Sequence, residues 1–361
     1  MEEPFPPAES HAGGLSVTPP QGTPAHAPRI QLPYELIVRV LRAGFESRFD
    51  PIDESQVSLL GTVSQLGKSW NAAAERFLYN SVVLQHRDQI LRFSRARSSR
   101  FPVKKLRILP NRKDPGLAMF RELASHALTT GHVINVDLTG YGLGKEGAEI
   151  LAQALTLNTT MRHLSVSNNN LMDPGGVAIV TALKTNRGLT DLNLSSNFIR
   201  GAGTTAALAD VLLVNDVLEV VNMDYNSASY EGISKLASAL ATNQTLTTLS
   251  LQSNALSSDS IAALADSLKE NTTLRNLDIS YNGVQVKVGY HIRDALNVNH
   301  SLVFLGLNSS GLDDIGASAL AQGLLRNDSL RELEVYQCPL SDEGRTSLIE
   351  CKRAGLVIWG L

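Results

Sequence analysis

The sequence predicts an α/β solenoid, a stack of similar strand–helix units that share one parallel sheet. Two rows of residues recur with a nearly constant spacing of 28 or 29 residues. The first row follows a short apolar alternation and includes Asn169, Asn197, Asn226, Asn254 and Asn282. The second row precedes each next alternation and consists of Asn158, Asn186, Asn215, Asn243, Asn271, Asn299 and Asn327. Two rows in phase over most of the chain are typical of a stacked repeat.

The residue pattern in each half of the repeat unit has a physical cause. Leu192 and Leu194 alternate with polar residues, as a half-buried strand requires. Asn197 follows where the chain turns, and its amide can bond backbone groups that the turn leaves unpaired. Segments such as 232–240 and 316–324 place Leu and Ala on one helical stripe. We expect the closing asparagines to adopt the left-handed conformation that often ends a helix.

These units resemble the ribonuclease-inhibitor class of leucine-rich repeat over residues 132–340. The resemblance implies a horseshoe with a parallel sheet on its concave face and helices on its convex face. Residues 341–361 are predicted to cap the last repeat with a short helix and a strand, and Trp359 is expected to shield the apolar edge.

Composition limits the class of protein. The chain has 361 residues, 43% of them hydrophobic, and a net charge of −3. Its only cysteines, Cys338 and Cys351, lack metal-ligand spacing, which favours a reducing compartment. We find no apolar run that could span a membrane and no signal peptide, so a cytoplasmic or nuclear location is expected. Residues 1–29 are rich in Pro, Gly and Ala and predict a disordered tail.

Residues 30–86 lack the repeat and predict a small helical module that ends in a short strand. The module resembles an F-box through Leu32-Pro33 with Glu35-Leu36, then Leu66 to Trp70, then Leu78-Tyr79 with Val82 and Leu84. An F-box implies docking to the Skp-type adaptor of a cullin complex. The residues that would bind the adaptor are Leu32, Pro33, Leu36, Ile37, Leu66 and Trp70. The alternative is that these helices only cap the open end of the solenoid.

Residues 87–131 form a basic connector and a degenerate leading repeat. The stretch from His86 to Lys113 carries ten Lys or Arg residues against Asp88 alone, a net charge of +9. A basic patch can bind nucleic acid, but only Phe93 and Phe101 lie among these charges, which is too little aromatic interleaving to indicate base stacking. We therefore expect a solvated connector and no nucleic-acid partner. Leu106 and Ile108 predict the leading strand, and 115–129 its helix.

The outward strand positions are the candidate binding surface. Most are small and polar, but the C-terminal repeats gather aromatic residues among carboxylates, a combination typical of protein-interface anchors. These candidate substrate-binding residues are Asp278, Tyr281, Phe304, Glu332, Glu334 and Tyr336. The scattered histidines show no metal or triad spacing, so we expect no catalytic residue, metal, cofactor or small-molecule substrate.

The sequence thus predicts a non-enzymatic recognition protein. With a working F-box it would be the substrate-recognition subunit of an SCF-type ubiquitin ligase, with an unknown protein substrate on the repeats. One alternative is a protein-binding repeat scaffold with no ligase link. A second is a GTPase-activating protein of the Ran type, which shares this repeat and for which the loop residue Arg200 would be the candidate.

Overall fold

The computed structural model describes residues 81–84, 104–108, 117–129, 133–283, 288–351 and 353–361. All of them belong to the second of two compact units, Arg48–Leu361, while the first unit is Met1–Ser47. The tail predicted at 1–29 lies outside the described residues. So does the helical module predicted at 30–86, apart from its last strand.

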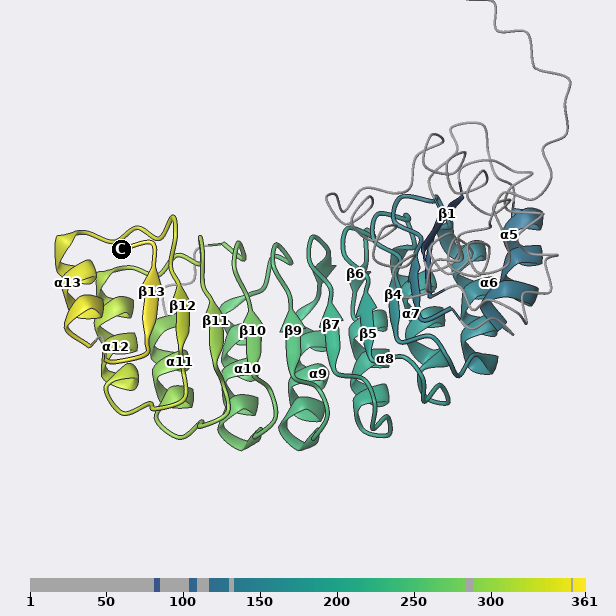
Figure 1. The fold of residues 1–361 in the computed structure, drawn as a ribbon. Helices are drawn as coiled ribbons and strands as arrows, with labels where there is room; N and C mark the ends of the chain where they lie inside the picture. The colour runs from purple at the N-terminus through teal and green to yellow at the C-terminus, as the bar shows by residue number, and fades with distance from the viewer. Residues whose placement is uncertain (1–80, 85–103, 109–116, 130–132, 284–287, 352) are drawn as a thin grey trace, which may run out of the picture. The chain divides into compact units, whose positions relative to one another are not determined.

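One parallel sheet runs through the described unit, and its eleven strands follow the order of the sequence (Figure 1). The strands are β1 (Ser81–Leu84), β2 (Lys105–Ile108), β3 (Asn135–Asp137), β4 (His163–Ser165), β5 (Asp191–Asn193), β7 (Val220–Asn222), β9 (Thr248–Ser250), β10 (Asn276–Asp278), β11 (Phe304–Gly306), β12 (Glu332–Glu334) and β13 (Val357–Trp359). Each strand pairs in register with the equivalent strand of the next repeat, as Leu277 does with Leu249 and Leu305.

The helices that alternate with these strands cover one face of the sheet and leave the other open (Figure 1). They are α5 (Leu117–Leu123), α6 (Gly144–Leu157), α7 (Met172–Ala182), α8 (Gly203–Leu212), α9 (Tyr230–Thr242), α10 (Ser258–Glu270), α11 (Val288–Leu296), α12 (Asp314–Leu324) and α13 (Asp342–Glu350). A π-helical turn, η1 (Ala124–Leu128), extends α5. The predicted α/β solenoid is confirmed. None of the helices in the described residues is long and apolar enough to cross a membrane.

The core lies between the sheet and the helices as one continuous apolar cluster from Leu84 to Ile358. The predicted inward strand residues are its centre: Leu189, Leu192 and Leu194 are at most 1% exposed. Burying a leucine side chain contributes about 1.5–3 kcal/mol, so the repeated leucines supply most of the driving force. No unit encloses these residues alone, which explains why the repeats must stack.

The first asparagine row forms a buried ladder along the turns, as predicted. The side-chain amide of Asn197 donates to the carbonyls of Val166 and Leu194, at 2.9 Å each. Its side-chain oxygen accepts from the N–H of Asn169 in the preceding repeat, at 2.8 Å. Asn226 then accepts from the N–H of Asn197 at 3.0 Å, so each rung ties two repeats together. The ladder satisfies backbone groups that the turns would otherwise bury without partners.

The expected conformation of the second asparagine row is wrong. Asn158, Asn243 and Asn271 are extended, with φ between −81° and −69° and ψ near 130°, and are not left-handed. The reason is a second ladder of side-chain hydrogen bonds between repeats. The amide of Asn271 reaches back to the carbonyls of Leu240 and Asn243, while its oxygen accepts from the N–H of Leu274. An extended backbone places the side chain for these three bonds.

Each end of the described sheet differs from the sequence prediction in one feature, a strand at the start and a side chain at the end. The strand β1 (Ser81–Leu84) ends the predicted helical module, yet it pairs with β2 and is the first strand of the sheet. At the other end β13 covers β12, as predicted. There Ile358 faces inward at 7% exposure and closes the apolar edge. Trp359 points the other way, at 44% exposure, because successive strand residues alternate between faces.

Candidate functional site

The open face of the sheet presents two side chains from each short strand. The three-residue strands bury their central residue, and most leave the flanking two half-exposed, as in Asn276, Leu277 and Asp278. Because neighbouring strands are in register, equivalent side chains form rows across the sheet. What distinguishes one end of this face from the other is therefore the chemistry of the residues in these rows.

The structure brings the six sequence-predicted residues together on β10, β11, β12 and the turns that follow them. We call this set the aromatic–acidic surface: Asp278, Tyr281, Phe304, Glu332, Glu334 and Tyr336. In one row Phe304 is paired with Glu332, and in the next Gly306 separates Asp278 from Glu334. Tyr281 and Tyr336 lie beyond the strand ends and are 43% and 45% exposed.

Sequence reasoning missed Trp359 as a neighbour of this surface. Its indole Nε1 donates to the Glu332 carboxylate at 2.7 Å, which fixes the ring beside the acidic side chains on the open face. The signal was present in the sequence. A strand that buries Ile358 must turn Val357 and Trp359 to the opposite side.

The carboxylates of this surface are held by neutral donors. Asp278 accepts from the side chain of Gln252 and from the N–H of Ser280. Glu334 accepts from the Asn308 side-chain amide at 2.6 Å. Among the described residues, no Lys, Arg or His lies within ion-pair distance of Asp278, Glu332 or Glu334.

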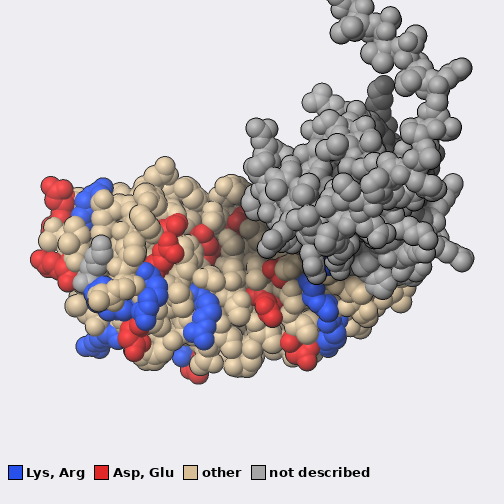
Figure 2. Space-filling model, viewed as in Figure 1, with Lys and Arg blue, Asp and Glu red and all other residues tan. Residues whose placement is uncertain are grey.

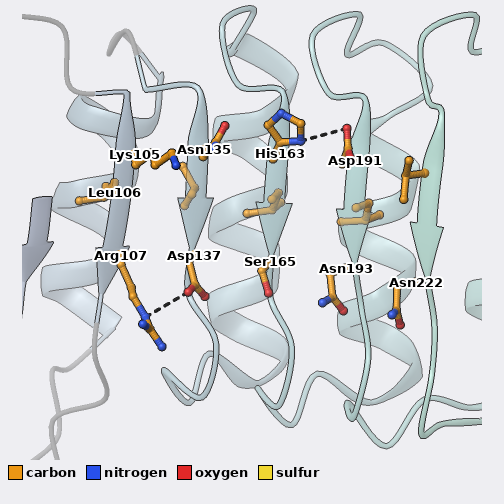
Figure 3. A pocket seen from close by; sticks show the side chains of 14 residues that line it. Lys105, Leu106, Arg107, Asn135, Asp137, His163, Ser165, Asp191, Asn193 and Asn222 are labelled. Atoms are coloured by element: carbon orange, nitrogen blue, oxygen red, sulfur yellow. Dashed lines mark ion pairs between the residues drawn. The ribbon is translucent and has the colours of Figure 1, made fainter. Parts of the chain in front are cut away.

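At the other end of the same face, two carboxylates each lie beside a basic side chain. Arg107 Nε lies 3.1 Å from Asp137 Oδ2, and His163 Nδ1 lies 3.0 Å from Asp191 Oδ2 (Figure 3). These side chains line an open trough of about 540 Å³ that extends from β2 to β7. The described residues contain no group of three or more His, Cys, Asp or Glu that could hold a metal ion.

The other candidate residues lie away from this face or outside the described chain. The adaptor-binding residues predicted in the helical module, from Leu32 to Trp70, lie outside the described residues. Arg200 is exposed in β6 (Arg200–Gly201), which pairs with β8 (Ser227–Ala228) to form a second, two-stranded sheet. Cys338 fills an asparagine position and donates its thiol to the Leu307 carbonyl at 3.3 Å, so its role is structural.

A family model described as "Leucine Rich repeat" matches residues 157–180, 242–265 and 270–287. The first stretch covers β4 and most of α7, the second covers β9 and the first part of α10, and the third covers β10. Leucine-rich repeats are therefore present in this chain, and the resemblance noted from the sequence is confirmed to that extent.

Two curated proteins share part of the repeat region. The chain is 30% identical to RAN GTPase-activating protein 2 of Arabidopsis thaliana over 102 residues, which are 28% of this chain and 18% of the relative. It is 40% identical to Leiomodin-2 of Gallus gallus over 57 residues, which are 16% of this chain and 10% of the relative. The matched region thus spans less than a fifth of the length of either protein.

Among solved structures, a chain of the yeast complex of Rad7 and Elc1 aligns with 91% of this chain and 93% of its own length. The sequence identity is 14% and the TM-score is 0.34.

Proposed function

We propose that this protein is a non-enzymatic recognition module that binds a protein partner on the open face of its sheet. The observation that carries the proposal is the exposure of Tyr281, Tyr336 and Trp359 at one end of that face. Exposed aromatic side chains gathered on one surface are typical of interface anchors, since each can bury a large area when a partner covers it.

A photo-cross-linking experiment tests this proposal. We would place a benzophenone side chain at Tyr336 on the open face, and in a matched variant at Tyr230, which is 52% exposed at the start of α9. A partner of the open face cross-links through position 336 and not through position 230. The partner is then purified, and its affinity is measured by calorimetry. Equal cross-linking at both positions, or capture only through position 230, would refute the assignment to the sheet.

We further propose that residues 30–86 act as an F-box, so that the sheet holds a substrate while other ligase subunits transfer ubiquitin. Support comes from the sequence motif alone, at Leu32-Pro33, Leu66 to Trp70 and Leu78-Tyr79. Such a receptor contributes effective concentration and would act in the cytoplasm or nucleus. The test is a pull-down of purified Skp-type adaptor by the full chain, compared with Leu32→Ala/Pro33→Ala. Failure of a folded wild-type chain to bind would leave a repeat scaffold whose N-terminal helices only cap the stack.

A second candidate function, activation of the GTPase Ran, is favoured by the 30% identity to a protein with that name. Arg200 is exposed, where it could reach a bound GTPase. The full chain would then accelerate GTP hydrolysis by Ran in a single-turnover assay. Arg200→Ala would reduce this acceleration, whereas Arg326→Ala, at an exposed position after α12, would not. No acceleration by the wild-type chain would exclude this function.

A further inference from the structure

We propose that the exposed aromatic residues of β10–β13 dock an extended segment of a partner protein that is rich in arginine or lysine. The proposal rests on the proposed function and specifies the chemistry of the partner. The docking surface consists of the aromatic–acidic surface together with Trp359.

The aromatic residues provide the contact area. Tyr281, Tyr336 and Trp359 are each more than two-fifths exposed, and Phe304 lies half-buried between them on β11. Among the described residues, no element covers this part of the sheet. An aromatic ring face attracts a guanidinium or ammonium group, and the attraction strengthens when a partner excludes water. The same rings can also pack against the aliphatic stems of arginine and lysine.

The charges select a cationic occupant. Asp278, Glu332 and Glu334 form no ion pair among the described residues, although on the same sheet Asp137 lies beside Arg107 and Asp191 lies beside His163. Figure 2 shows acidic side chains over this part of the sheet and basic ones nearer the starts of the strands. The nearest arginines in sequence, Arg275 and Arg331, donate to the backbone carbonyls of Ser301 and Asp328. Within the described part of the chain, these arginines therefore direct their N–H groups to backbone carbonyls and form no ion pair with the three carboxylates.

Gly306 places no side chain between two of these carboxylates. It is paired with Asp278 on one side and Glu334 on the other. The Asp278 carboxylate leans over the glycine, which is buried, so a Cβ at position 306 would clash with it. Because the strand between them contributes no side chain here, a cationic side-chain end that lies above Gly306 can approach the carboxylates of both Asp278 and Glu334, an arrangement suited to charge-assisted hydrogen bonds.

The test measures binding of fluorescent twelve-residue peptides to the full chain by anisotropy. One peptide alternates arginine with glycine, and in matched peptides citrulline or glutamate replaces arginine. We expect the arginine peptide to bind, with an affinity that falls as salt is raised, and the other two to bind at least about tenfold more weakly.

Two double variants, each of which removes two negative charges, show where on the sheet the peptide binds. Asp278→Asn/Glu334→Gln keeps the shape and one oxygen acceptor of each side chain but removes two negative charges, and should weaken arginine-peptide binding about tenfold or more. Asp137→Asn/Asp191→Asn removes two charges at the other end of the sheet and should change the affinity less than about twofold. Tyr336→Leu should also weaken binding, because leucine keeps apolar volume but lacks the ring face.

Three results would overturn the proposal: equal binding of the citrulline or glutamate peptide, an unchanged affinity in Asp278→Asn/Glu334→Gln, or displacement of the peptide by a second copy of the chain. The cross-linking experiment separates this outcome from failure of the proposed function. If a partner cross-links at position 336 and the arginine peptide does not compete with it, the partner chemistry is wrong and the recognition function stands. If position 336 captures nothing beyond position 230, the recognition function itself fails.

Discussion

Replacing Asn197 with alanine tests whether the asparagine ladder holds neighbouring repeats together. The side chain is fully buried, donates to the carbonyls of Val166 and Leu194, and accepts from the N–H of Asn169. Alanine would leave the buried Asn169 N–H without this partner, whereas the Val166 and Leu194 carbonyls keep the side-chain amides of Asn169 and Asn226. Since an orphaned buried polar group costs about 1–3 kcal/mol, we expect the free energy of unfolding to fall by about 1–3 kcal/mol.

Urea denaturation followed by far-ultraviolet circular dichroism measures this loss. Hydrogen exchange should accompany it, because repeat arrays can unfold in parts. The Asn169 amide should then exchange faster in Asn197→Ala. Asn276→Ala is the matched control, since Asn276 lies on the open face and donates only to the Thr248 hydroxyl, so its loss should stay below about 1 kcal/mol. Equal losses in the two variants would show that water replaces the ladder and that the repeats are held by apolar packing alone.

Three further results are expected. Gly289→Ala should lower the free energy of unfolding by about 2 kcal/mol despite the better helix propensity of alanine, because the new Cβ would meet the backbone of Gly316 in α12. A higher free energy of unfolding, measured by urea denaturation, would contradict this close approach. The hydrogen bond from His300 lowers the pKa of the Asp328 carboxyl, so the pair contributes stability above the ordinary carboxyl range and loses it as pH falls through the lowered pKa. In His300→Ala a carbon-13 NMR titration should show the Asp328 pKa rising toward its usual value. An unchanged pKa of Asp328 would disprove the assigned cause. Burial raises the pKa of the Cys351 thiol to about 11, so iodoacetamide at pH 8 should label Cys351 slowly in the folded chain and rapidly in urea. Fast labelling of Cys351 in the folded chain would show that its thiol is accessible to solvent.

The sequence predicts the repeat well because burial imposes a strict pattern on it. Residues such as Leu192 and Leu194 must face the core in every unit, and a buried turn can be satisfied only by a side chain like that of Asn197. The strands, helices and first asparagine row could therefore be assigned by counting. The same count places Tyr281 and Tyr336 in the turns that follow β10 and β12.

Other features depend on contacts between repeats, which no local pattern reveals. The conformation of Asn271 is set by the carbonyl groups of Leu240 and Asn243 in the preceding unit, and general helix-ending preferences gave the wrong backbone. Pairing of β1 with β2 joins segments separated by a stretch with no repeat. The neutralisation of Asp137 by Arg107 likewise appears only when the strands are placed side by side.

Stability and recognition are carried by different rows of the same short strands. The inward residues are nearly alike from repeat to repeat, so they cannot distinguish one part of the sheet from another. The outward residues are free of that constraint, and at the C-terminal end they combine exposed rings with carboxylates such as Glu334 that have no cationic neighbour among the described residues. Retaining such uncompensated charges and exposed rings contributes little to folding. Exposed rings also occur at Phe198 and Tyr225, so what marks the C-terminal end is the grouping of Tyr281, Tyr336 and Trp359 with carboxylates that form no ion pair among the described residues. This grouping is better explained by a partner than by the fold, and changes there should alter binding far more than stability.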